Sequence, residues 1–180
     1  MLAAKLRWRW LQGGPDLWKE IWPIKYNMPN NPEEIIRKQD MPRGSDIWNL
    51  SIQNRDLVDN NIFWEIKGGQ IARFWDESWQ QRGKLVNLTG MQEIQRRGIH
   101  RNLITVNDYW DADQGNGEWR IWKPLEQWER NPTEEQKTTF TKEMNSRKIR
   151  NREGKDLLRW GKGTKGSFTI QEAYKLKAYQ

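Results

Sequence analysis

Clusters of basic side chains are the residues of this 180-residue chain whose types and spacing point most directly to chemistry. The densest run, residues 147–155, holds five lysines and arginines. A second run surrounds His100, and a third alternates with tryptophans near the N-terminus. Lysine and arginine neutralise the phosphates of nucleic acids, and aromatic rings stack on unpaired bases. These runs therefore predict contact with RNA or DNA.

Two sets of residues carry this prediction. The predicted nucleic-acid-binding residues are Lys5, Arg7, Arg9, Arg96, Arg97, Arg101, Arg147, Lys148, Arg150, Arg152, Lys162 and Lys165. The aromatic residues predicted to stack or to form an interface are Trp8, Trp10, Trp64, Trp75 and Trp79. Both sets have a simpler interpretation, in which the charges mark exposed helix ends and the tryptophans pack in the core.

The sequence gives little support for a metal-binding loop, a phosphate-binding P-loop or a catalytic site. Asp108, Asp111 and Asp113 are spaced like part of a calcium-binding loop, but that loop's twelfth position is occupied by Trp122 instead of glutamate. The glycine-rich segment 161–166 lacks the order of a phosphate-binding P-loop. We predict no catalytic residue, no metal and no cofactor, and we expect no small-molecule substrate.

Composition narrows the classes of protein further. The chain has no cysteine and one histidine, which excludes disulfides and thiolate zinc sites. The formal net charge is +7, which favours polyanionic partners. No stretch approaches the ~20 apolar residues of a membrane-spanning helix. The first fifteen residues carry no acid, so an organelle-targeting segment stays open beside a helix.

Helices are predicted in several places around these charges. Apolar spacing indicates helices over 2–11 and from Pro15 towards Pro23, which would bend or end the second one. A short helix is expected after Asn31-Pro32, another after Ser45, and a longer one from Pro132 to Met144.

Two glycine-containing segments predict β-hairpins. Gly68-Gly69 lies between the runs 62–67 and 70–75, and a two-residue turn there would pair Ile66 with Ile71. The strand 157–160 would return as 167–170 after a glycine-rich loop. Thr169 and Glu172 then have the spacing of a capping box for a C-terminal helix.

The fold class predicted from these elements is α+β. Helical hairpins would pack on one or two short antiparallel β-hairpins around a tryptophan-rich core, with proline-rich joints. The expected segments are a helical hairpin (1–26), a linker (27–44), an α+β domain with a central β-hairpin (45–130), and a helix, β-hairpin and C-terminal helix (131–180).

The C-terminal segment also resembles a known family. Trp160, Gly166, Phe168, Ala173 and Tyr174 are similar to the "W, loop, G-x-F-S-V-x-x-A-Y" signature of plant non-LTR (LINE-type) retrotransposon reverse transcriptases. Earlier segments match other blocks of that family in the same order. They hold Trp8, Trp10, Leu17, Trp18, Ile21, Trp22 and Tyr26; Ser45, Ile47, Trp48, Trp64, Gly68, Phe74, Trp75 and Trp79; and Val106, Asp108, Trp119 and Trp128.

The resemblance implies the region between the polymerase core and the zinc-binding C-terminal part. The family's catalytic aspartate motif is missing, so we expect no enzyme activity from this chain. The expected role is binding of nucleic-acid backbone and scaffolding, in the nucleus or cytoplasm. The alternative is a domesticated structural subunit, docked by a tryptophan-rich surface into a larger protein or ribonucleoprotein assembly.

Overall fold

The computed structural model describes residues 2–87, 104–111, 118–120, 132–147, 149, 154–161 and 166–178. This part of the chain has an α+β fold with mostly helices, short strands and an aromatic core, as predicted. The strands β1 (Ile62–Glu65) and β4 (Leu157–Trp160) form one two-stranded sheet, and β2 (Trp110–Asp111) pairs antiparallel with β3 (Glu118–Trp119) in another.

The chain divides into two compact units. Unit 1 contains Met1–Ile62 and Leu158–Gln180, and unit 2 contains Phe63–Leu157. This division differs from the four consecutive segments expected from the sequence. The C-terminal segment belongs with the N-terminal helices because Trp160 packs edge-on against Trp8, with 6.0 Å between ring centroids.

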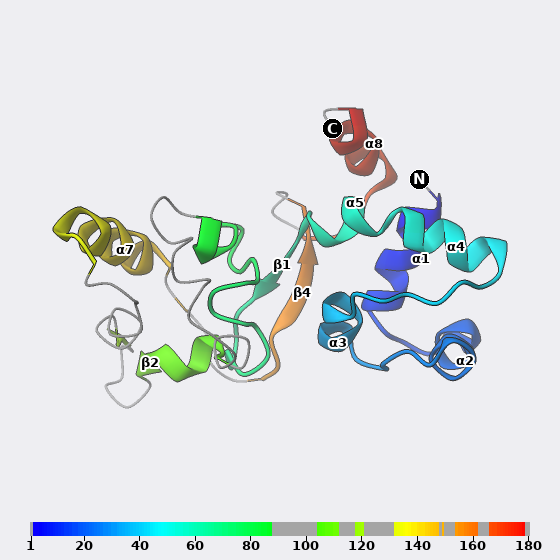
Figure 1. Cartoon of the computed structure of the whole chain (residues 1–180), viewed down its shortest axis with the longest axis horizontal. Coiled ribbons are helices and arrows are strands. Elements are labelled where there is room, and N and C mark those ends of the chain that lie inside the picture. The colour runs from blue at the N-terminus through cyan, green and yellow to red at the C-terminus, as the bar shows by residue number, and fades with distance from the viewer. Residues whose placement is uncertain are drawn as a thin grey trace. The chain divides into compact units, whose positions relative to one another are not determined.

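Unit 1 is built from helices (Figure 1). They are α1 (Leu2–Leu11), α2 (Leu17–Tyr26), α3 (Pro32–Arg37), α4 (Asp46–Gln53), α5 (Arg55–Asp59) and α8 (Ile170–Ala178). The start of α3 is as predicted, since the Asn31 side chain accepts a hydrogen bond from Glu34 N. Pro23 does not end α2, which continues to Tyr26.

The core of unit 1 is a cluster of indole rings. Trp10, Trp22 and Trp48 meet edge to face with centroid distances of 5.1–5.5 Å, and Tyr26 stacks on Trp48 at 4.1 Å. Edge-to-face pairs let the positive ring edge meet the negative face, so each contact contributes beyond the buried area. This cluster replaces the aliphatic residues that the composition lacks.

Unit 2 has its own aromatic core around α7 (Glu134–Ser146). It also includes the short helical turns η1 (Leu85–Asn87) and η4 (Val106–Tyr109). Phe74 contacts the rings of Trp75, Tyr109 and Phe140, and Phe140 comes from α7. The start of α7 is a capping box, in which Thr133 accepts from Gln136 N and the Gln136 side chain accepts from Thr133 N.

The hairpin predicted over 62–75 is wrong. β1 ends at Glu65, and the Gly68-Gly69 segment wraps around the buried carboxylate of Asp156. That carboxylate accepts hydrogen bonds from Lys67 N (2.9 Å), Gly69 N (2.8 Å), Ile71 N (3.0 Å) and Ala72 N (3.2 Å). A charged acceptor offers these amides stronger bonds than a paired strand would.

The return strand predicted over 167–170 is also absent. Residues 166–169 have no regular structure, although Trp160 N donates to Gly166 O at 2.8 Å and so closes the reversal. The helix after it is as predicted, and the Thr169 hydroxyl accepts from Glu172 N at 3.2 Å. The Glu172 carboxylate does not complete the predicted capping box, because it accepts from Trp160 Nε1 at 3.1 Å.

Candidate functional site

Most of the predicted nucleic-acid-binding residues lie outside the described part of the chain. These are Arg96, Arg97, Arg101, Lys148, Arg150, Arg152, Lys162 and Lys165. The structure places the remaining four, Lys5, Arg7, Arg9 and Arg147, and it separates them into two buried and two exposed side chains.

Arg7 is buried and cannot reach a phosphate, which corrects the prediction for this residue. Its Nε and Nη2 atoms donate to the two carboxylate oxygens of Asp59 at 2.9 and 2.6 Å. Asp59 also accepts from Arg55 Nε at 3.0 Å, and the other Arg55 nitrogens donate to the carbonyls of Ile36 and Gln39. The cluster joins α1 to α5 and to the end of α3.

Arg147 is also buried, and the prediction for it is corrected in the same way. It pairs with Glu143 at 2.8 Å and lies over the Trp79 ring, 4.4 Å from the centroid. Its other nitrogens donate to the carbonyls of Trp79, Arg82 and Gly83 at 3.2–3.3 Å. Burial lowers the pKa of Arg147, and its bond to Glu143 opposes that change. Arg147 thus fastens the end of α7 inside unit 2.

The five tryptophans predicted to stack or form an interface are all buried. Trp8, Trp10, Trp64, Trp75 and Trp79 expose between 0 and 7% of their surface. Their rings lie in the two cores, so they offer no face to a base or a partner. Core packing, the simpler interpretation, is therefore correct for this set.

Lys5 and Arg9 remain on the surface of α1. Lys5 is exposed, while Arg9 pairs with the Asp16 carboxylate at 2.9 Å. Asp16 also accepts from Lys19, and this hydrogen bond is the main reason why the pKa of Asp16 is lowered. An arginine held by a carboxylate contributes less free charge than the sequence pattern implied, so Lys5 is the more available cation of the two.

Sequence reasoning missed the exposed face of α8. The segment 158–180 carries five basic side chains and a single acidic one, Glu172, whereas the whole chain has 31 basic and 24 acidic side chains. Tyr174 is 62% exposed on α8, and Lys175 and Lys177 are exposed beside it. Tyr174 and Lys177 are three residues apart, so they share one helix face. The local charge count could have found this face.

The fold holds α8 so that this face stays outward. Ala173 is buried, and α8 contacts α1 and α5 within unit 1 (Figure 1). The single acid of the segment, Glu172, is turned inward to Trp160 Nε1. It packs so closely on Gly161 that a Cβ at that position would lie 2.2 Å from Glu172 Oε1. Lys175 and Lys177, which are exposed on α8, therefore do not have the Glu172 carboxylate beside them on the outer face.

The described residues hold neither a candidate metal centre nor a membrane-spanning helix. They contain no group of three or more histidine, cysteine, aspartate or glutamate side chains placed to hold a metal ion. None of the helices described is long and apolar enough to cross a membrane.

The comparisons with known proteins do not narrow the family or the function of this chain. No family model, no curated protein and no solved structure matches this chain.

Proposed function

We propose that this chain binds single-stranded nucleic acid without catalysing a reaction, and that the α8 face is its main contact with the strand. We further propose, from the resemblance of its motifs, that the chain derives from a LINE-type reverse transcriptase, between the polymerase core and the zinc-binding part. The observation that carries the binding proposal is the charge of segment 158–180, five basic side chains against one inward-turned acid.

The side chains on α8 suit both parts of a nucleotide. Lys175 and Lys177 supply positive charge for phosphates, and Tyr174, directly before Lys175, supplies an exposed ring. Base–aromatic stacking contributes roughly 1–3 kcal/mol per base and tolerates any sequence. Lys5 on the neighbouring helix α1 adds a further exposed cation to unit 1. Unit 1 as a whole has fourteen basic and nine acidic side chains.

Salt dependence of binding tests this proposal. The affinity of the full chain for a single-stranded oligonucleotide is measured by fluorescence anisotropy at a series of salt concentrations. Each phosphate contact on a single strand contributes a slope of about −0.7 to log K against log salt. Replacing both lysines, K175Q with K177Q, is expected to make the slope less negative by about 1.4.

A matched double variant separates local contact from net charge. K84Q with K142Q removes two exposed lysines of unit 2 and changes the net charge by the same amount. We expect this control to keep the slope of the unmodified chain. Binding that does not change with salt, or an equal change in both double variants, would reject the α8 face as the binding surface.

A second candidate function, a structural subunit docked on a larger protein, is favoured by α2. Leu17, Ile21 and Ile24 recur at helical spacing and are 69, 45 and 86% exposed. The docking surface would then be aliphatic, since the five tryptophans predicted to form an interface are buried. If this function holds, the native chain elutes in a nuclease-resistant assembly, and I21E with I24E elutes alone. Elution of the native chain alone after nuclease treatment argues against it.

A further inference from the structure

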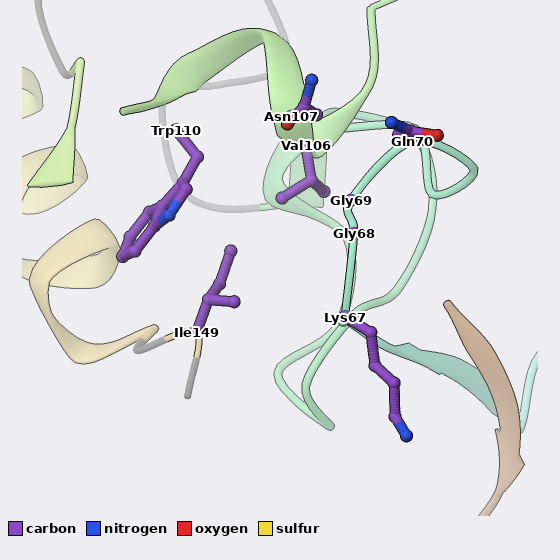
Figure 2. Close-up of a pocket in the computed structure, with 8 residues that line it drawn as sticks. All are labelled: Lys67, Gly68, Gly69, Gln70, Val106, Asn107, Trp110 and Ile149. Atoms are coloured by element: carbon purple, nitrogen blue, oxygen red, sulfur yellow. The ribbon is translucent and has the colours of Figure 1, made fainter. Parts of the chain in front are cut away.

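Unit 2 contains a pocket that none of the predicted functional residues lines (Figure 2). Its volume is about 160 Å³. The lining residues are Lys67, Gly68, Gly69, Gln70, Val106, Asn107, Trp110 and Ile149. They come from the loop around Asp156, from η4 with the residue after it, and from the segment that follows α7.

The pocket has one aromatic and aliphatic side and one side made of backbone. Trp110 and Ile149 lie side by side on the first, and the Val106 side chain points into the space next to them (Figure 2). Gly68 and Gly69 form the second and project no side chain. Trp110 is half-buried, and its ring is braced by an edge-to-face contact with Trp119 at 4.5 Å. An apolar lining of this kind favours a flat ring over a bare anion.

The backbone side is held in place before any ligand arrives. Asp156 accepts the amides of Lys67 and Gly69, and Asn107 N donates to Gly69 O at 2.9 Å. Neither glycine can carry a side chain here, because a Cβ would lie 2.9 Å from Gly154 O at Gly68 and 3.0 Å from Asn107 N at Gly69. A fixed wall lowers the entropy that binding must overcome.

We propose that this pocket binds a nucleobase, stacked on the Trp110 indole and flanked by the Gly68-Gly69 backbone. Pockets for drug-sized ligands span about 300–1,000 Å³, so a smaller volume suits a single ring system. The exposed Asn107 amide at the rim offers a donor and an acceptor, the pair that recognises the edge of adenine. Lys67 lies at the opposite end of the pocket from Asn107 in Figure 2, and its side chain extends away from the space beside Trp110.

Two kinds of ligand would present a base to this pocket: a free nucleotide, or a strand with an unpaired base. Calorimetry with the full chain distinguishes them. The probes are adenosine monophosphate, ribose 5-phosphate, which lacks the base, and a short oligoadenylate. We expect adenosine monophosphate or the oligonucleotide to bind, and ribose 5-phosphate to give no heat. Trp110→Ala should weaken the binding of the base by roughly tenfold or more.

Two more variants separate a loss of the pocket from unfolding and from the loss of any indole. Ile149→Trp fills the pocket and leaves Trp110 in place, so it should weaken binding as much even if Trp110→Ala unfolds. Trp18→Ala removes another half-buried indole, from unit 1, and should leave binding unchanged. Equal binding of ribose 5-phosphate, wild-type affinity in both pocket variants, or no binding of either base-containing probe would overturn the proposal.

The proposal for the pocket and the proposal for the α8 face can be rejected independently of each other. Binding of adenosine monophosphate that survives K175Q with K177Q places the base in unit 2 and not on α8. An oligonucleotide affinity that depends on Trp110, without binding of the free nucleotide, assigns the pocket to an unpaired base of a strand. A loss of oligonucleotide binding only in the lysine variant, with no effect of either pocket variant, contradicts the base pocket and leaves the α8 face supported.

Discussion

Replacing Asp156 by asparagine should destabilise the protein strongly, although the two side chains have nearly the same shape. The carboxylate of Asp156 is buried and accepts four backbone amides from residues 67–72. Asparagine keeps one acceptor oxygen and turns an NH2 group towards two of those amides. Two donors would then face a donor in a region from which water is excluded.

The size of this effect follows from the hydrogen bonds that are lost. A hydrogen bond to a charged group contributes ~1.5–3 kcal/mol, so losing two of the four gives on the order of 3–6 kcal/mol. In a chain of this size each kcal/mol lowers the melting temperature by about 2–4 °C. We expect Asp156→Asn to melt on the order of 10 °C below the unmodified protein.

Thermal unfolding followed by circular dichroism measures this, with Asp108→Asn as the matched control. Asp108 is exposed and accepts from Thr105 N (2.7 Å) and the Thr105 hydroxyl (2.9 Å) at the start of η4. An exposed cap of this kind contributes about 1 kcal/mol. If Asp156→Asn lowers the melting temperature no more than Asp108→Asn does, the buried carboxylate does not hold the loop and the reasoning is wrong.

Three other perturbations follow from the same structure. Arg147→Met leaves a carboxylate and three carbonyls without their buried partner and should cost about 3–5 kcal/mol, measured by urea unfolding. Gly161→Ala should destabilise more than Gly13→Ala in the same assay; both have positive φ, but only Gly161 has Glu172 against its missing Cβ. The lowered folded pKa of Asp16 means that its stabilising contribution is present above the unfolded value of 3.8 and is lost as pH falls through the folded value. An NMR titration of the Asp16 carboxyl that shows no shift below 3.8 would contradict this.

Local signals in the sequence predicted the helices well. The Asn31-Pro32 start of α3, the apolar spacing over 2–11 and the helix predicted from Pro132 to Met144 all rest on interactions within a few residues. Such patterns depend on local backbone geometry, which the sequence specifies directly. Of the two effects predicted for Pro23, a bend or an end of the helix, the end is wrong, because packing of the Trp22 and Tyr26 rings in the unit 1 core stabilises the last turn of α2.

Other predictions were wrong because the residues concerned have partners that lie far away in sequence. The Gly68-Gly69 hairpin was a sound local inference, but Asp156, almost ninety residues away in sequence, offers the loop a buried charged acceptor. The roles of Arg7 and Arg147 failed for the same reason, since Asp59 and the carbonyls around Trp79 lie far from them in sequence. A run of basic residues reports charge, but it does not report which members face a buried carboxylate.

The basic character of the α8 face could have been predicted from the sequence. Residues 158–180 hold most of the chain's net positive charge, and Thr169 marks the start of the helix that displays it. What the sequence did not reveal was that Glu172 turns inward to Trp160 and that Tyr174 turns outward. The pocket beside Trp110 has no sequence motif at all, because its walls come from three separated segments of unit 2.

Photo-crosslinking of a 5-bromouracil-substituted single strand to the full chain, mapped by mass spectrometry, tests the central claim most directly. The claim is that the outward face of α8 holds the strand. The account predicts that the most abundant crosslink lies at Tyr174 and disappears in K175Q with K177Q, while it persists in K84Q with K142Q. Crosslinks confined to other segments, with none between residues 158 and 180, would contradict it.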